Sequence, residues 1–220
     1  MADVEKQKQN CAKKALSYVK GGMILGLGTG TTADYFVKFL AESGLDVKCV
    51  CTSHRTKKLA TSLGLKVFSL DDVDKIDLAV DGADVVSSDK SLIKGYGGAL
   101  TREKIIEYTA EKFVVIVDSA KMAQKLARPV PVEYLPFAKR MVENGLRKLG
   151  AKKLVDRMDS EKLFSSDNSF YIVDADFGTI LDPADLEKKI NHIPGVLENG
   201  IFSRPVFKVI IGKDKGVEEI

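Results

Sequence analysis

Short apolar runs alternate with amphipathic segments along the first part of the chain. The runs are four or five residues long and mostly apolar, as in Met23-Ile24-Leu25-Gly26-Leu27, which is typical of buried parallel strands. The segments between them have apolar residues at helical spacing. We expect strands at residues 23–27, 47–51, 67–70, 76–80 and 113–117, and helices at residues 4–19, 33–41, 56–63 and 101–111. Strands that alternate with helices predict a parallel sheet with right-handed crossovers.

The pattern changes at Arg128-Pro129-Val130-Pro131, where two prolines mark a break. The order then becomes strand, helix, strand, strand, helix, strand, which is the split βαβ pattern of a small α+β lobe. We expect strands at 130–134, 153–157, 170–174 and 196–202, and helices at 137–149 and 183–191. The last apolar run, 206–211, is expected to return to the first sheet. The predicted fold class is therefore α/β: a Rossmann-like parallel-sheet domain of residues 1–127 and 204–220 with an inserted ferredoxin-like α+β lobe of residues 128–203.

Composition narrows the possible partners. The chain has 34 Lys and Arg against 31 Asp and Glu, a net charge of +3, and no basic run, so no nucleic-acid partner is expected. No apolar run approaches the ~20 residues that span a bilayer, and the charged first segment lacks the apolar centre of a signal peptide. The three cysteines, Cys11, Cys49 and Cys51, suggest neither a disulfide framework nor a zinc site, and we expect Cys49 and Cys51, which lie in an apolar run, to be buried thiols. We therefore expect a cytoplasmic protein with no membrane partner.

A glycine loop follows the first predicted strand and precedes a helix. Glycines such as Gly28 and Gly30 let backbone N–H groups approach a ligand, and a helix N-terminus offers free donors and partial positive charge. The hydroxyls of Thr29, Thr31 and Thr32 add further polar groups. Phosphate binding suits this loop, although a simple tight turn with a threonine cap explains it equally well.

The loop is spaced GxGxG, which differs from the GxGxxG of dinucleotide-binding folds. The next strand ends at Cys51-Thr52-Ser53-His54-Arg55, with no acidic residue to bind the ribose hydroxyls of NAD. Arg55 could still meet a 2′-phosphate, so an NADP-binding oxidoreductase stays open as an alternative.

A cluster of charged residues begins where a buried strand ends, at Asp81. Asp84 follows three residues later, Lys94 precedes a glycine cluster, and Glu103 lies at the start of a predicted helix. Singly, Glu103 could complement the helix dipole, Lys94 could be an exposed loop charge and Asp84 could cap a turn. Together they favour a site, because a lysine beside several carboxylates helps them stay ionised. Ligands bind beyond the carboxyl ends of parallel strands, so we expect these residues, the glycine loop and Lys121 in one crevice.

Three motifs, DGADVV, KGYGGALTREK and GLGTGTTA, resemble those of the type A ribose-5-phosphate isomerase family, and the resemblance covers essentially the whole chain, including PVPVE, ILDP and NHIPGV. It implies that Glu103 transfers the proton, while Asp81, Asp84 and Lys94 assist proton movement and hold sugar hydroxyls. The residues implied to bind substrate are Thr29, Gly30, Thr31, Thr32, Asp81, Gly82, Ala83, Asp84, Lys94, Gly95, Tyr96, Gly97 and Lys121.

The implied activity is the interconversion of ribose 5-phosphate and ribulose 5-phosphate through a cis-enediolate, in the non-oxidative pentose phosphate pathway. We expect no cofactor and no metal, since the two histidines, His54 and His192, lie in different regions. The expected partners are a small sugar phosphate and further copies of the chain, as a homodimer or a dimer of dimers.

The chain departs from the family pattern in two places. The glycine run often reads KGGGAAL in the family, whereas Tyr96 stands in this chain, where we expect it at the mouth of the crevice. The family is often serine-rich after the second strand, where this chain has residues 52–56, TSHRT, which puts a backbone grip on substrate there in doubt. A non-enzymatic sugar-phosphate sensor is a further alternative, but it would usually have a DNA-binding segment, and none is apparent.

Overall fold

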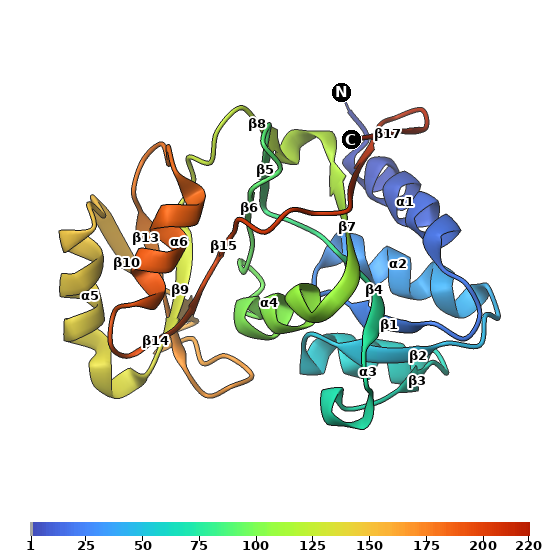
Figure 1. Cartoon of the computed structure of the whole chain (residues 1–220), viewed down its shortest axis with the longest axis horizontal. Helices are drawn as coiled ribbons and strands as arrows, with labels where there is room; N and C mark the ends of the chain where they lie inside the picture. Colours follow the sequence, from blue (N-terminus) through green and yellow to red (C-terminus); the bar gives the residue numbers. More distant parts are fainter. Residues whose placement is uncertain (1) are drawn as a thin grey trace. The chain divides into compact units, whose positions relative to one another are not determined.

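The computed structural model describes residues 2–220, which form two compact units (Figure 1). Unit 1 comprises the chain up to Ala83 together with Arg102–Lys121 and Val206–Ile220, and unit 2 comprises Asp84–Thr101 and Met122–Pro205. No helix within the described residues is both long enough and apolar enough to cross a bilayer.

Unit 1 is built on a seven-stranded sheet in the order β17-β16-β7-β4-β1-β2-β3. Its strands are β1 (Ile24–Leu27), β2 (Lys48–Cys51), β3 (Lys66–Val67), β4 (Ile76–Asp81), β7 (Ala110–Asp118), β16 (Lys208–Gly212) and β17 (Val217–Glu219). All neighbours pair in parallel except β16 and β17. The six parallel strands therefore have the doubly wound order 3-2-1-4-5-6 of a Rossmann fold.

Four helices accompany this sheet: α1 (Val4–Ala15), α2 (Thr31–Glu42), α3 (His54–Ser62) and α4 (Leu100–Thr109). Local capping explains where two of them begin. The Asp3 side chain accepts the Lys6 N–H at 3.0 Å, and the Ser53 hydroxyl accepts the Thr56 N–H at 3.0 Å. The apolar faces of α1 and α2 then join β1, β4 and β7 in one core, whose fully buried members include Phe36. In Figure 1, α1 and α2 lie together beside the sheet.

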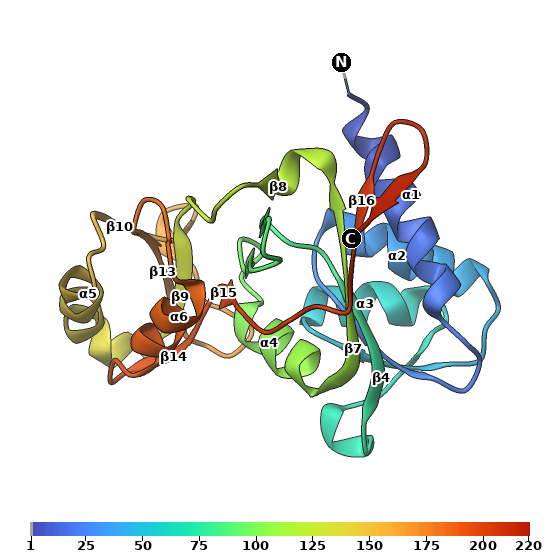
Figure 2. The ribbon, with the colours of Figure 1, turned by 45° about the horizontal axis from the view of Figure 1, so that its top comes forward.

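The main sheet of unit 2 is antiparallel, in the order β10-β13-β9-β14. Its elements are β9 (Val130–Tyr134), α5 (Lys139–Lys148), β10 (Lys153–Asp156), β13 (Tyr171–Asp176), α6 (Pro183–Asn191) and β14 (Val196–Asn199). Val142 and Leu146 of α5 and Ile190 of α6 belong to the same buried cluster as Tyr134, so both helices cover one face of the sheet (Figure 2). This is the ferredoxin-like arrangement.

Unit 2 also contains several short strands and single turns. A second four-stranded sheet has the order β15-β6-β5-β8, and β11 pairs with β12 in a small hairpin. Their bounds are β5 (Val85–Ser87), β6 (Leu92–Ile93), β8 (Met122–Ala123), β11 (Met158–Asp159), β12 (Lys162–Leu163) and β15 (Ile201–Phe202). The short 3-10 helices of the two units are η1 (Leu16–Tyr18), η2 (Leu70–Asp72), η3 (Ser119–Lys121) and η4 (Pro136–Ala138).

These observations confirm the predicted fold class, a Rossmann-like sheet with a smaller α+β lobe. The last apolar run was also predicted correctly, because β16 pairs in parallel with β7 of the first sheet. The predicted boundaries at 128 and 203 stay a prediction. The compact units additionally group 84–101 with the segment that begins at Met122.

Most predicted elements have bounds that differ from those of the structure by a few residues, and three of them also differ in kind or continuity. The helix expected over 4–19 ends as an α-helix at Ala15 and continues as η1, and the strand expected over 67–70 is confined to β3. The strand expected over 196–202 is divided at Gly200, where a Cβ would lie 2.3 Å from the carbonyl oxygen of Lys94. The chain leaves one sheet at this glycine and joins the other, because β15 pairs with β6.

Candidate active site

The parallel strands of unit 1 bring several predicted site residues to one edge of the sheet. Adjacent strands β1, β4 and β7 pair in parallel and end at Leu27, Asp81 and Asp118. Residues that follow their carboxyl ends therefore lie along the same edge. These residues are the glycine loop from Gly28, the segment from Gly82, and η3, which ends at Lys121. This edge is where open α/β sheets bind ligands.

Asp81 and the glycine loop form one interlocked structure. One carboxylate oxygen of Asp81 accepts the Thr29 N–H at 3.1 Å and the Gly82 N–H at 2.6 Å, and the residue is 1% exposed. A Cβ at Gly28 would lie 1.9 Å from the carboxyl carbon of Asp81, so only glycine permits this approach. The loop therefore fixes the orientation of the Asp81 carboxylate.

A cluster of hydroxyl groups from the segment after β2 contacts the glycine loop. The Thr29 hydroxyl lies 2.7 Å from that of Thr52, 2.7 Å from that of Ser53 and 3.0 Å from that of Thr56. The Thr56 hydroxyl also donates to the carbonyl of Gly28 at 2.9 Å. The segment after β2, which departs from the family pattern, therefore supports the loop through side chains. Sequence reasoning missed this role, because the three hydroxyls have no motif spacing.

The start of α2 is the part of the loop that can meet a ligand. Gly30 precedes the helix at a φ of 140°, and no atom lies within 4 Å of the position that its Cβ would occupy. Thr31 is exposed and Thr32 is half-buried in the first helical turn. The first N–H groups of a helix have no partner within it, and together with the helix dipole they favour an anion.

Glu103 lies in the first turn of α4 and is 2% exposed. The helix leads directly into β7, so it runs opposite to the strands and begins at their carboxyl edge. Ile106 packs on β1, since a Cβ at Gly26 would lie 2.5 Å from its side chain. Glu103 is one turn before Ile106 on the same helix face, so it lies closer to the carboxyl edge that holds Asp81.

Unit 2 contains the remaining predicted site residues. Lys94 is 2% exposed, and its ammonium nitrogen lies 5.6 Å from the centroid of the Phe202 ring. The Asp84 N–H donates to the Ile93 carbonyl at 2.9 Å, so Asp84 and Lys94 are close neighbours across β5 and β6. A buried ammonium group and a half-buried carboxylate thus lie at adjoining ends of two short strands.

The glycine run after Lys94 has a defined conformation. Gly95 has a φ of 100°, and the N–H of Tyr96 donates to the Asp84 carboxylate at 3.0 Å. The Tyr96 hydroxyl donates to the Pro129 carbonyl at 3.0 Å. Burial, with the negative charges of Asp84 and Asp174, raises the pKa of the Tyr96 phenol to about 12. Tyr96 therefore stays protonated at neutral pH, and it is 39% exposed beside the exposed Gly97.

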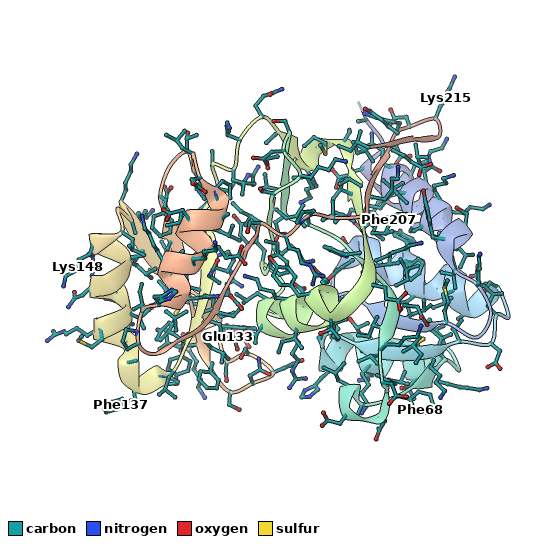
Figure 3. All side chains as sticks on the ribbon, in the orientation of Figure 1. Phe68, Glu133, Phe137, Lys148, Phe207 and Lys215 are labelled. Atoms are coloured by element: carbon teal, nitrogen blue, oxygen red, sulfur yellow. The ribbon has the colours of Figure 1, made fainter. Side chains whose placement is uncertain are left out.

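The glutamate of the PVPVE motif, Glu133, has a structural role in unit 2. It is fully buried in β9 and is labelled in Figure 3. Its carboxylate accepts the hydroxyl of Thr101 at 2.5 Å, the hydroxyl of Ser166, and the amide of Asn168 at 3.1 Å. The motif therefore ties the first turn of α4 to the polar turn after β12.

The structure bears on the NADP alternative and on the expectation of buried thiols. Arg55, the cation that could have met a 2′-phosphate, forms an ion pair with Asp34 of α2, which weakens the NADP alternative. The expectation of buried thiols holds for Cys49 but is wrong for Cys51, which ends β2 and is half-buried. Among residues 2–220, no three His, Cys, Asp or Glu side chains gather as metal ligands would.

Comparisons with known proteins agree on one family. Residues 48–216 match the family model of ribose 5-phosphate isomerase A (phosphoriboisomerase A). The ribose-5-phosphate isomerase A of Thermococcus kodakarensis is 44% identical over 226 residues, covering 99% of each chain. The solved ribose 5-phosphate isomerase A from Methanocaldococcus jannaschii has a TM-score of 0.93 and 43% identity, with 98% of each chain covered. A solved D-ribose-5-phosphate isomerase in complex with phospho-erythronic acid has a TM-score of 0.95 and 43% identity, with 99% of each chain covered. The chain therefore belongs to the ribose 5-phosphate isomerase A family, whose members are aldose–ketose isomerases.

Proposed function

We propose that this chain interconverts ribose 5-phosphate and ribulose 5-phosphate in the non-oxidative pentose phosphate pathway. Family membership over the length of the chain supports the activity. The structural observation that carries the proposal is the placement of two buried carboxylates, Asp81 and Glu103, at the edge of the sheet that also presents the glycine loop. At such an edge the carboxylates can transfer protons on a sugar whose phosphate the glycine loop binds.

The reaction moves a proton between C1 and C2 of the open-chain sugar through a cis-enediolate. In the proposal, Glu103 removes the proton from C2 of the aldose and returns it to C1, on one face of the sugar. The ammonium of Lys94 stabilises the negative charge that develops on the enediolate oxygen. Asp81, supported by Asp84, moves protons among the hydroxyls and assists opening of the furanose ring.

The phosphate group is proposed to bind at the start of α2. Gly30, Thr31 and Thr32 supply backbone donors and hydroxyls there, and Lys121 follows a neighbouring strand of the same sheet. The related isomerase bound to phospho-erythronic acid supports a phosphorylated ligand in this family. The proposed substrate contacts also include Gly82 and Ala83, and Gly95 to Gly97, as the family resemblance implies.

Thr31→Asp tests the phosphate assignment. A carboxylate in the first turn of α2 would repel a phosphate, and like charges a few Å apart repel by more than about 1 kcal/mol, so KM should rise roughly tenfold or more. Thr31→Asn is the matched control, because it has the same size without the charge. KM for ribose 5-phosphate should change much less in this control, and an unchanged KM in Thr31→Asp would remove the loop from the site.

We further propose that the protein forms a homodimer or a dimer of dimers through the smaller lobe. An exposed apolar patch on unit 2 supports this: Phe137 is 95% exposed and Met141 66%. Figure 3 labels Phe137, which lies in η4 just before α5. Leu135 and Leu197 are 43% and 41% exposed, and the pairing of β9 with β14 brings them near each other. A patch of large apolar side chains is typical of a surface that another chain covers.

Phe137→Asp tests this surface. Burying a charge in an apolar interface is costly, so the variant should elute and scatter light as a smaller species than the wild type. Gel filtration with light scattering measures the change. Lys148→Asp, a charge change at the last residue of α5, serves as the control and should keep the wild-type mass. An unchanged mass for Phe137→Asp would contradict pairing through this patch.

A cytoplasmic location is also proposed. Cys11, Cys49 and Cys51 are free thiols. Burial raises the pKa of Cys11 and Cys49 to about 12 and that of Cys51 to about 11, so all three stay protonated and poorly reactive at neutral pH. Unpaired cysteines of this kind suit a reducing compartment.

A further inference from the structure

An arginine outside the predicted site holds the glycine run of unit 2. Arg157 lies just after β10, and Asp174 lies on the neighbouring strand β13. The Arg157 Nε donates to one Asp174 oxygen at 3.1 Å, and Nη2 donates to the other oxygen. The pair is largely shielded from water, with side chains 13% and 23% exposed. This two-point contact fixes the plane of the guanidinium group.

The remaining nitrogen of the guanidinium reaches the loop. Arg157 Nη1 donates to the Gly95 carbonyl at 2.5 Å, and the Tyr96 carbonyl lies 3.5 Å away. Gly95 directly follows Lys94 and is in a left-handed conformation, where a Cβ would lie 2.7 Å from the Leu100 side chain. A planar group with five fixed donors can hold a carboxylate and a carbonyl together, which an ammonium cannot do in the same geometry.

The same loop also contacts the second functional group of unit 2. The N–H of Tyr96 donates to the Asp84 carboxylate, so a continuous series of contacts runs from Asp174 through Arg157 and the loop to Asp84. On the other side, the Lys94 N–H donates to the Gly200 carbonyl at 2.9 Å. The backbone is therefore held just before Lys94, at its own N–H, and just after it, at the Gly95 carbonyl.

We propose that Arg157 and Asp174 are positioning residues for the isomerase reaction, which hold the loop so that Lys94 and Asp84 keep their working orientation. The proposal rests on the roles proposed above for Lys94 and Asp84. Stability alone is a weak reason for this pair, since a shielded ion pair contributes little net stability compared with apolar packing. Arg157 also donates to the carbonyl of Gly95, the residue that follows Lys94. This contact favours a role in placing Lys94.

Arg157→Lys and Asp174→Asn test the proposal with small changes. Arg157→Lys keeps the positive charge but loses the planar fork, and Asp174→Asn keeps the shape but loses the negative charge. Misplacing a catalytic group by about 1 Å can cost about a hundredfold, so each variant should lower kcat roughly 10- to 100-fold with little change in KM. The kcat of the double variant should be no lower than that of the less active single variant, because both residues act through one contact.

Matched measurements separate positioning from folding. Arg147→Lys, an exposed arginine of α5 that pairs with Glu143, should keep the wild-type kcat and shows what an ordinary Arg to Lys change does. Thermal unfolding followed by circular dichroism gives the folded fraction of each variant, and kcat is expressed per folded chain. If Arg157→Lys does not fold, Asp174→Asn takes its place in the comparison.

The outcomes distinguish this proposal from the function on which it rests. A wild-type kcat per folded chain in Arg157→Lys and Asp174→Asn, while Lys94→Met is impaired, would overturn the positioning role alone. A full rate in Lys94→Met would overturn the assignment of Lys94 first. A fall in kcat in both Arg157→Lys and Asp174→Asn, with KM and the unfolding midpoint near those of the wild type, is the expected result.

Discussion

Replacing Glu103 by Gln is expected to lower kcat by roughly 10² to 10⁴, with little change in KM. The amide has nearly the same shape as the carboxylate but cannot accept the proton from C2. Because the side chain is 2% exposed, water cannot readily take over this role. The rate of ribulose 5-phosphate formation from ribose 5-phosphate measures the change.

Glu107→Gln is the matched control for this experiment. Glu107 lies one turn later on α4 and is also 2% exposed, so it has the same residue type, helix and burial. It is expected to keep most of the wild-type kcat, because no proton-transfer role is assigned to it. A full rate in Glu103→Gln would show that another group is the base.

Replacing Lys94 by Met is expected to lower kcat by roughly 10² to 10³. The thioether fills the space of the lysine side chain over the Phe202 ring but offers no positive charge to the enediolate. A melting curve recorded beside the kinetics gives the folded fraction of the variant, and kcat is expressed per folded chain.

Lys104→Met is the corresponding control, because Lys104 is also buried, at 4% exposure, with its ammonium 5.9 Å from the Tyr108 ring centroid. Comparable rate losses in the two lysine variants would contradict a specific role for Lys94. A loss confined to Lys94→Met would support the assignment of charge stabilisation to this residue.

The fold was predictable because its signals are local. Runs such as residues 23–27 are apolar enough to identify buried strands, and the strand bounds of β9 and the helix bounds of α6 were predicted to the residue. Strands of two or three residues, such as β5 and β6, have no periodicity to detect, so the second sheet of unit 2 was missed. Gly200 was read as part of one strand because its contact with Lys94 joins residues distant in sequence.

The position of Asp81 at the end of a buried strand was predictable, while its catalytic role stays a prediction. The structure adds that the Asp81 carboxyl group occupies the space where a side chain at Gly28 would lie. The supports of the site were not predictable, because they depend on tertiary contacts. Thr56 reaches the loop across 28 residues and Arg157 reaches Gly95 across 62, and neither residue type signals such a role in the sequence.

The central claim is that this chain isomerises ribose 5-phosphate by proton transfer through a carboxyl group. The most direct measurement is to incubate the wild-type protein with ribose 5-phosphate in D2O, to continue after the aldose–ketose ratio has become constant, and to follow the sugars by NMR. Ribulose 5-phosphate should appear, with deuterium entering at C1 because the Glu103 carboxyl exchanges its proton with solvent over repeated turnovers. No ribulose 5-phosphate above the enzyme-free rate, or product that keeps only protium at C1, would contradict the account.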